Sequence, residues 1–530
     1  MQRVVVIGGG ATGSGILRDL AMRGIPAVLV EQGDLVHGTS SRYHGLLHSG
    51  GRYAVKDPES ARECATENAI LRRIAPFAVE PCGGIFLQLA QDDPSYAARW
   101  VSACQKAGVA VEPVDIERMR QEEPGISPSA VAAYRVPDAS VDGFRLITGN
   151  IAAAEALGAR VLTYHRVTDL LIDQTRVTGV QVTNERTGEE ETLEADLVIN
   201  AAGAWTGQIT AMAGIHLDLV ADRGVLLVYH GRLTSRVINR LRPPGNGDIF
   251  VPAGTVTLLG TTATPVDNPD NLDIPPDEVA ALLRLGADLL PAAATARVLR
   301  AFAGVRPLFK AKGAGASTRD LPRTYQIVDH DVEHGVPGLI SILGGKLTTY
   351  REMAEKAVDV AASHLGVTTP CRTALEPILP PPDVDVVRRI QVQVGAAQTT
   401  ALLDRHPAGL EDVAQALEAP TGTEIICECE QVTRGELVAV AHSLPDPSLS
   451  DIRRRTRLGM GTCQGAYCGY RAALVLAEEG LAEPAAAPAM MLDLQAERWR
   501  GVSAALPGPE LRGAELTYAL YSGLFGGTKR

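Results

Sequence analysis

Four of the eight cysteines in the chain lie in two close pairs, and thiols spaced in this way can ligate metal. Cys427 and Cys429 form a CxC pair, and 33 residues separate them from Cys463 and Cys468, which have four residues between them. Four thiolates suit either an iron–sulfur cluster of the [2Fe–2S] type or a structural zinc ion. The residues alone leave both alternatives open.

A second chemical motif is rich in glycine and opens the chain. Gly8, Gly10 and Gly13 follow an apolar run in the pattern G-x-G-x-x-G, and a second apolar run, 27–30, ends before Glu31. This order predicts a strand, a turn, a helix and a strand, in which the glycines bring backbone N–H groups to a pyrophosphate at the helix N-terminus. Glu31 is then placed to accept hydrogen bonds from a ribose. The N-terminus is therefore expected to bind a dinucleotide.

Two later segments extend this pattern. A buried strand ends before Ala202 and Gly203, and another strand, at 338–343, ends before Gly344 and Gly345. We expect these pieces to return to the N-terminal sheet. A nicotinamide dehydrogenase usually completes its sheet in one continuous stretch, so the discontinuity favours FAD over NAD.

The elements around these motifs divide the chain into four regions. Residues 206–320 are predicted to form a β-rich insertion, and the prolines at 380–382 mark a linker because proline lacks an N–H and restricts its neighbour. The predicted regions are an oxidoreductase over 1–370, a linker with a helical connector over 371–420, a cysteine domain over 421–475 and a helical tail over 476–530. Within the first region, the nucleotide-binding parts cover about 1–80, 142–205 and 322–370, and the substrate-binding parts cover about 81–141 and 206–321.

Composition excludes several classes of protein. The 530 residues carry 50 basic and 62 acidic side chains, a net charge of −12, which gives no general attraction for nucleic acid. No apolar run is long enough to span a bilayer or to act as a signal peptide, so the sequence predicts neither. Without a secretion signal, the cysteines are expected to be reduced thiols or metal ligands in the cytoplasm.

Several motifs together resemble one known family. The segments are Gly38-Thr39-Ser40-Ser41-Arg42, His48-Ser49-Gly50-Gly51-Arg52-Tyr53, Gly304-Val305-Arg306-Pro307-Leu308 and Gly344-Gly345-Lys346-Leu347-Thr348-Thr349-Tyr350-Arg351. They look like the FAD-dependent glycerol-3-phosphate dehydrogenases over about residues 1–366, and 44–55 look closest to the large catalytic subunits of the anaerobic branch. The resemblance implies an α/β fold with a Rossmann-like FAD-binding domain of the glutathione-reductase or D-amino-acid-oxidase type and an inserted β-rich substrate domain.

The same resemblance implies roles for individual residues. The catalytic candidates are His48, Arg306 and Lys346, and the candidates for substrate contact are Arg52, Tyr53, Arg306, Arg323 and Lys346. The candidates for cofactor contact are Gly8, Gly10, Gly13, Glu31, Thr39, Ser40, Ser41, His48, Ala202, Gly203, Gly344, Gly345, Lys346, Leu347 and Thr348. Arginine suits a phosphate because its planar fork of donors is permanently charged.

Each of these roles has an ordinary structural alternative. Arg306 could pair with a carboxylate, Lys346 could be a solvated residue after a turn, and Arg319 is an alternative to Arg323 in the alignment. His48 is suited to act as a general base near neutral pH, because its unperturbed pKa is about 6.5. Alternatively, it is a loop histidine that packs against the flavin.

The cysteine region has its own resemblance. The CxC pair and the approach Leu458-Gly459-Met460-Gly461-Thr462 resemble the small, mainly helical ferredoxin domain of the bacterioferritin-associated type, over about 423–475. The resemblance implies a [2Fe–2S] cluster bound by Cys427, Cys429, Cys463 and Cys468, with zinc as the alternative.

Taken together, the resemblances imply oxidation of sn-glycerol 3-phosphate to dihydroxyacetone phosphate by hydride transfer to FAD. Electrons then pass through the cluster toward a quinone or toward electron-accepting, membrane-associated partner subunits. A cytoplasmic protein, peripheral on the inner membrane, would fit this role, and oligomers are compatible with it. An amino acid or a 2-hydroxy acid is the alternative substrate, and a zinc-stabilised interaction module is the alternative role for the C-terminal domain. Several cations in the pocket would favour a phosphate, whereas one arginine opposite an apolar wall would favour a carboxylate.

Overall fold

The N-terminal apolar run forms a central strand of a mostly parallel sheet. In the computed structural model, which describes residues 4–309, 324–506 and 508–524, β1 (Val4–Ile7) pairs with β2 (Ala27–Val30) on one side and with β13 (Leu197–Asn200) on the other. The six strands follow the order β20-β21-β13-β1-β2-β9, completed by β20 (Tyr325–Asp329), β21 (Leu339–Gly344) and β9 (Arg160–Leu162). Segments far apart in sequence thus meet in one sheet, which confirms the predicted convergence.

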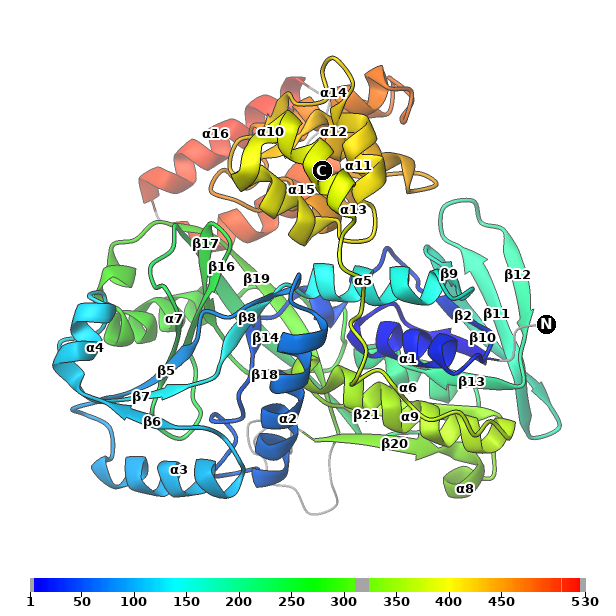
Figure 1. The fold of residues 1–530 in the computed structure, drawn as a ribbon, viewed down its shortest axis with the longest axis horizontal. Helices are drawn as coiled ribbons and strands as arrows, with labels where there is room; N and C mark the ends of the chain where they lie inside the picture. Colours follow the sequence, from blue (N-terminus) through cyan, green and yellow to red (C-terminus); the bar gives the residue numbers. More distant parts are fainter. Residues whose placement is uncertain (1–3, 310–323, 507, 525–530) are drawn as a thin grey trace.

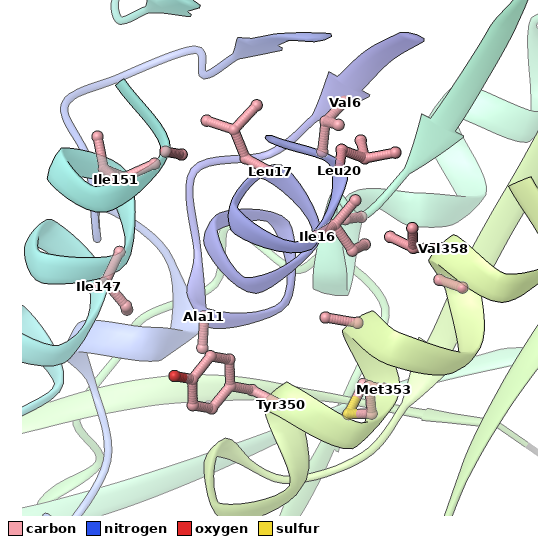
Figure 2. Packing of buried hydrophobic residues seen from close by; sticks show 14 of the residues in the cluster. Val6, Ala11, Ile16, Leu17, Leu20, Ile147, Ile151, Tyr350, Met353 and Val358 are labelled. Carbon is pink, nitrogen blue, oxygen red and sulfur yellow. The ribbon is translucent and has the colours of Figure 1, made fainter. Parts of the chain in front are cut away.

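Helix α1 (Ala11–Met22) packs between α5 (Gly143–Glu155) and α9 (Tyr350–Leu365). Figure 2 shows Leu17 of α1 on the side of α5 and Ile16 facing α9. A Cβ atom at Gly15 would lie 2.9 Å from the Tyr350 ring, so a glycine is needed where α1 and α9 approach. Side chains of α1, its two neighbouring helices and the sheet belong to one buried apolar core. Burial of this surface therefore holds α1, and with it the glycine turn before it, in a fixed position.

A second, larger sheet forms the β-rich part. Its order is β18-β14-β17-β16-β15-β5-β7-β6, and β19 pairs with the other edge of β14. The strands are β5 (Gly84–Leu89), β6 (Glu112–Val114), β7 (Ala130–Val136), β14 (Leu219–His230), β15 (Val237–Arg240), β16 (Ile249–Ala253), β17 (Val256–Gly260), β18 (Thr264–Val266) and β19 (Val298–Phe309). This sheet and helix α7 (Pro276–Leu289) share a buried core that includes Phe250 and Leu282.

Shorter elements connect and cover the two sheets. The small strands are β3 (Leu46–Leu47), β4 (Val79–Glu80) and β8 (Ala139–Val141), and the three-stranded ribbon is β10 (His165–Asp173), β11 (Arg176–Asn184) and β12 (Glu190–Glu194). The remaining helices of this part are α2 (Pro58–Ile74), α3 (Pro94–Lys106), α4 (Ile116–Glu122), α6 (Thr206–Ala211) and α8 (His330–His334). Helix α2 runs between the two sheets in Figure 1.

The C-terminal third is mainly helical and lies over both sheets in Figure 1, coloured yellow to red. Its elements are α10 (Val384–Arg405), α11 (Leu410–Leu417), β22 (Ile425–Cys427), β23 (Val432–Thr433), α12 (Arg434–His442), α13 (Leu449–Thr456), α14 (Cys468–Glu478), α15 (Ala487–Ala505) and α16 (Gly508–Leu524). Helix α10 contains a kink at Gly395. Among the described helices, none combines the length and the apolar character needed to cross a membrane.

Charged pairs and close packing fix this helical part on the oxidoreductase. Arg455 donates to both oxygens of Asp34, at 2.7 and 2.8 Å, and Arg457 Nη1 lies 2.9 Å from Asp142 Oδ2. A Cβ atom at Gly501 of α15 would lie 2.3 Å from the Ala301 carbonyl oxygen, so the helix and β19 are in close contact. The tail is helical, as the sequence predicts, and α15 spans 19 residues.

Candidate active site and cysteine cluster

A cavity of about 870 Å³ lies beyond the carboxyl ends of β1, β2 and β13 and reaches strands of the second sheet. The predicted site residues that line it are Gly8, Gly10, Glu31, Thr39, Ser40, His48, Arg52, Tyr53, Ala202, Gly203, Arg306, Gly344, Gly345, Lys346, Leu347 and Thr348. Gly13 and Ser41 do not line it, and Arg323 lies outside the described residues. The fold therefore gathers residues from seven separated segments around one space.

The glycine turn shapes one end of the cavity. Gly8 has a φ of +111°, and a Cβ atom there would lie 2.6 Å from the Ala201 carbonyl oxygen. A Cβ atom at Gly13 would lie 1.9 Å from the Gly8 carbonyl oxygen, so Gly13 lets the helix pack on the turn. Gly10 precedes α1, and the Ala11 N–H donates a 3.0 Å hydrogen bond to Ser40 Oγ. The open helix N-terminus faces the cavity, as an anion site requires.

Glu31 stiffens the loops beside this turn. Its carboxylate accepts hydrogen bonds from the N–H groups of Gly9, at 2.7 Å, and Gly33, at 2.9 Å. Burial raises the pKa of Glu31, although these two N–H donors oppose the shift. The side chain remains at the cavity wall.

Two further loops complete the wall near the first sheet. Thr39 Oγ1 donates to the Val305 carbonyl oxygen, which ties the 38–42 loop to β19. Gly203, with a φ of +59°, begins a short turn after β13, and a Cβ atom there would meet no atom within 4 Å. Ser41 instead donates to the Gly38 carbonyl oxygen and faces a different cavity.

The turn after β21 brings Lys346 into the site. Gly344 and Gly345 have φ values of +73° and +84°, and a Cβ atom at Gly345 would lie 2.4 Å from Met353 Sδ. Lys346 Nζ donates a 3.0 Å hydrogen bond to Ser60 Oγ and lies 3.5 Å from Glu63 Oε2. Lys346 is therefore held by α2.

His48 connects this turn to a second loop. Its backbone N–H donates a 3.1 Å hydrogen bond to Thr348 Oγ1, and its Nε2 lies 3.5 Å from the Tyr53 hydroxyl. Burial lowers the pKa of His48 well below its usual value, and His44, Arg52 and the nearby lysine add to the shift. The imidazole is therefore neutral near pH 7 and able to accept a proton.

Arg306 projects from β19 and is paired. Its guanidinium contacts Asp222 and Thr261 Oγ1 and donates a 2.8 Å hydrogen bond to the Thr262 carbonyl oxygen. A Cβ atom at Gly224 would lie 2.2 Å from Arg306 Nη2, so the arginine depends on glycine on the neighbouring strand. These contacts hold the guanidinium at the cavity wall.

Sequence reasoning missed residues that hold the site residues in place through hydrogen bonds and ion pairs. Asp138 accepts a 2.7 Å hydrogen bond from the Ser49 N–H and a 3.0 Å bond from Asn239 Nδ2. Burial raises the pKa of Asp138, while these donors oppose the shift. Asp222 also escaped notice, because 84 residues separate it from Arg306 and no motif marks it. His44 also lines the cavity. Its position four residues before His48, on the same loop, is a sequence signal that could have identified it.

The four paired cysteines meet at one end of the helical part. A thiol hydrogen bond with Cys468 lowers the pKa of Cys427 to about 7 and that of Cys463 to about 5. Burial raises the pKa of Cys429, which also interacts with Cys463. Within the described ranges, no three or more histidine, cysteine, aspartate or glutamate side chains form a ready ligand set for one metal ion. The four thiols are therefore neighbours, connected in the order Cys427, Cys468, Cys463 and Cys429.

Glycines surround these thiols and leave little room for larger residues. A Cβ atom at Gly461 would lie 2.4 Å from Cys429 Cβ, and one at Gly459 would lie 3.0 Å from the Cα atom of Gly465, between Cys463 and Cys468. The glycine-rich approach noted in the sequence therefore packs directly on the cysteines. Four neighbouring cysteines that are buried or half-buried supply the soft sulfur ligands that an iron–sulfur cluster requires, once the thiols are deprotonated.

Comparisons with known proteins match both parts of the chain. The family described as "FAD dependent oxidoreductase" matches residues 3–351, and the "BFD-like [2Fe-2S] binding domain" matches residues 425–478. The chain is 43% identical over 527 residues to the A subunit of the anaerobic glycerol-3-phosphate dehydrogenase of Escherichia coli K12, covering 99% of this chain and 96% of that protein. It is 40% identical over 529 residues to the A1 subunit of the anaerobic enzyme of Haloferax volcanii, covering 98% and 90%.

Solved structures show the same fold. A glycerol-3-phosphate dehydrogenase from Bacillus halodurans, complexed with FAD, matches with a TM-score of 0.72 at 23% identity and 96% coverage of both chains. Glycine oxidase from Bacillus cereus matches with a TM-score of 0.56 at 21% identity, over 69% of this chain and 98% of its own.

The fold and the two sites define a flavin oxidoreductase with an added iron–sulfur domain. The chain belongs to the family of anaerobic glycerol-3-phosphate dehydrogenase A subunits. The fit of FAD rests on the glycine cradle at Gly8 and Gly10, the open helix N-terminus and a cavity large enough for an extended ligand.

Proposed function

We propose that this chain oxidises sn-glycerol 3-phosphate to dihydroxyacetone phosphate in the 870 Å³ cavity. The observation that carries the proposal is the number of cations in the wall. Arg42, Arg52, Lys56, Arg62, Arg166, Arg306 and Lys346 all line it, against three carboxylates, Glu31, Asp57 and Glu59. Several cations favour a phosphate, whereas a 2-hydroxy acid or an amino acid needs one cation for its carboxylate. The names of the relatives agree with this substrate.

Several separate segments of the chain would hold the cofactor in this proposal. The Gly8–Gly10 turn and Ser40 would contact the pyrophosphate, and Glu31 would accept hydrogen bonds from the ribose. Lys346 would stand beside the flavin ring. When bound, FAD accepts a hydride from the substrate carbon, and the [2Fe–2S] cluster carries electrons onward one at a time.

The residues of the chain supply the proton transfer and the orientation of substrate. His48 accepts the hydroxyl proton at Nε2 in this proposal: its lowered pKa makes the imidazole neutral near pH 7, and the tautomer with the proton on Nδ1 leaves Nε2 as the acceptor. Tyr53, whose hydroxyl lies 3.5 Å from that nitrogen, orients the same hydroxyl group. Arg306 and Arg52 bind the phosphate, and their existing contacts with Asp222 and Asp248 keep them in place.

The substrate assignment has a direct test. Full-length protein loaded with FAD is titrated anaerobically with sn-glycerol 3-phosphate while the visible absorbance of the flavin is followed. We expect the flavin to bleach, whereas D-lactate, L-proline and glycine leave it oxidised. Bleaching by one of these compounds and not by glycerol 3-phosphate would move the assignment to the alternative substrate class.

Electrons leave the cluster for a membrane-associated partner in this proposal. Helix α16 supports it with an exposed stripe, because Leu516, Leu520 and Leu524 are 62%, 57% and 75% exposed and recur every four residues. The Tyr521 hydroxyl on this helix donates a 2.7 Å hydrogen bond to the Ala466 carbonyl oxygen, between Cys463 and Cys468. The stripe therefore belongs to a helix that contacts the cysteine loop.

Docking at α16 is tested with the purified chain and membranes from cells that lack it. Replacing Leu516 and Leu520 with serine should abolish glycerol 3-phosphate-dependent reduction of membrane quinone while anaerobic flavin bleaching remains normal. Unchanged quinone reduction would remove α16 from the proposed path.

A further inference from the structure

A second cavity, of about 920 Å³, lies between the helical C-terminal part and the oxidoreductase. Elements α5, β14 and β19 contribute one side of its wall, and α10, α13, α15 and the segment after Cys429 contribute the other. His37, Arg42 and Tyr43 line this cavity and also the catalytic cavity. The space therefore lies between the two proposed redox centres, and a ligand in it would touch both domains.

Arginines without carboxylate partners line this interdomain cavity. Within the described part of the chain, the guanidinium groups of Arg42, Arg300 and Arg500 make no hydrogen bond to protein and have no carboxylate within 4 Å. Burial lowers the pKa of Arg300 to about 9, and the neighbouring Arg453 adds to the shift. Such crowding of cations is unfavourable unless an anion neutralises it.

Five carboxylates line the cavity, and Glu80, Asp142, Asp404 and Glu430 lie within 4 Å of arginines other than Arg42, Arg300 and Arg500. The fifth, Glu497, acts electrostatically on Arg42 and Arg300 and is already engaged. Glu497 lies 3.2 Å from Arg453 Nη1 and accepts a 3.1 Å hydrogen bond from Ser450 Oγ. Burial tends to raise the pKa of Glu497, but Arg453, Arg300 and Arg454 outweigh it and hold the pKa at about 2. Arg453 Nε is also buried without a hydrogen-bond partner in the described structure. A positive excess therefore remains at this wall.

The other lining arginines of α13 and its C-terminal end are neutralised by the protein. Arg454 pairs with Asp34 and Asp451, and Arg457 pairs with Asp142 and Glu430. These pairs hold the domains together without using Arg300 or Arg500. Arg454 and Arg457 therefore have a structural role, whereas Arg300 and Arg500 face the cavity without a carboxylate partner.

An adjoining part of the wall is apolar. Val228, Val256, Leu258 and Phe302 line the cavity and belong to one small cluster of buried and half-buried hydrophobic side chains. The guanidinium carbon of Arg300 lies 5.5 Å from the centre of the Phe302 ring, so the cationic and apolar zones adjoin. A ligand that fills both zones needs a charged end and a hydrophobic body.

We propose that this interdomain cavity binds an amphipathic anion, in which a dianionic head of the phosphate monoester type contacts Arg42, Arg300 and Arg500 and an apolar body packs on Phe302. Arg300 stands on β19 and Arg500 on α15. The ligand therefore bridges the two domains and stabilises their contact by mass action.

The test uses full-length protein loaded with FAD and 1-naphthyl phosphate as the probe. Dihydroxyacetone phosphate is kept at saturation so that the catalytic cavity is filled, and binding of the probe is followed by calorimetry. We expect one binding event, which Arg300→Gln combined with Arg500→Gln weakens by at least about tenfold, since charge-assisted hydrogen bonds are lost. Arg388→Gln, at an exposed arginine outside the cavity, is the matched control and should bind as the unmodified protein does.

Two outcomes would overturn the proposal. The first is a failed probe experiment, in which 1-naphthyl phosphate does not bind or uncharged 1-naphthol binds equally well. The second is unchanged affinity for 1-naphthyl phosphate in the double variant. If the double variant loses FAD or unfolds, Arg500→Gln alone serves, because this side chain is exposed and changes little of the core.

The source of the anion is distinguished in a second arm. Co-sedimentation with vesicles of phosphatidic acid in phosphatidylcholine, lost in the same variant, would assign the site to a lipid head group. Binding of 1-naphthyl phosphate without such co-sedimentation would assign it to a soluble phosphate. Either result supports an amphipathic anion site. Co-sedimentation that persists in the double variant would contradict the proposed role of these arginines in binding the anion.

Discussion

The backbone N–H of His48 donates a 3.1 Å hydrogen bond to Thr348 Oγ1 and thereby joins two loops that are 300 residues apart in sequence. Both ends of this bond are buried. The proposed base and the turn that carries Lys346 consequently cannot move independently. This single contact couples the proton acceptor to the cofactor side of the cavity.

Replacing Thr348 with valine should uncouple these loops. The His48 N–H would be left buried without an acceptor, at a cost of about 1–3 kcal/mol. We expect turnover with glycerol 3-phosphate to fall about tenfold, as such a cost predicts, and Thr348→Ser to retain activity because it keeps the acceptor oxygen. Steady-state kinetics of both variants test this. Equal loss in the serine and valine variants would contradict it.

Lys346→Met should remove a positive charge from the site. We expect turnover to fall about 100-fold, in line with the loss of one preorganised charge-stabilising group, and the reduction potential of bound FAD to become more negative. Lys356→Met, at an exposed lysine on α9, is the matched control. A spectroelectrochemical titration measures the potential, and an unchanged value would remove Lys346 from the flavin environment.

The pH profile should report on His48. A base must be unprotonated, and its pKa is lowered well below 6.5 by burial and by neighbouring cations. Activity should therefore persist as the pH falls through 6.5 and decline only at lower pH. His48→Asn should lower kcat/KM and abolish the acid limb. An acid limb that survives in this variant would assign the proton to another group.

The cysteines should be required after flavin reduction and not before it. Cys429→Ser should lower iron and acid-labile sulfide, because a thiolate ligand is lost. Anaerobic bleaching of FAD by glycerol 3-phosphate should remain, while reduction of a membrane acceptor stops. Cys104→Ser, at a buried cysteine in a different core, is the control. Zinc without iron in the unmodified protein would contradict the cluster assignment.

Asp34→Asn should weaken the docking of the helical part. Removing one partner of a buried ion pair costs about 3–5 kcal/mol, because Arg455 would remain charged and buried. Burial tends to raise the pKa of Asp34, but Arg455 and Arg454 outweigh it and lower the pKa. The pair therefore stabilises the fold above the usual aspartate range and loses this contribution as the pH falls through the lowered pKa.

Chemical unfolding and limited proteolysis measure this docking. Asp385→Asn, which breaks the exposed pair with Arg388, should change stability little and serves as the comparison. Equal stability of the Asp34 and Asp385 variants would show that apolar packing alone fixes the interface.

The sequence by itself determined the dinucleotide-binding start and the cysteine pairs. Local patterns suffice there, since strand, glycine turn, helix and second strand follow one another within about 31 residues, and β1, α1 and β2 form as that order predicts. The resemblance to a known family added candidate site residues in later loops. It could do so because this chain carries several motifs of that family together.

Only the tertiary structure decided which partners these residues have. Arg306 meets Asp222 because β19 pairs with β14, and Lys346 meets Ser60 because the turn after β21 packs on α2. The interdomain cavity likewise depends on how α15 lies on β19. Such contacts join residues that no local pattern relates, since strand pairing and helix packing bring distant segments together to bury a shared apolar surface.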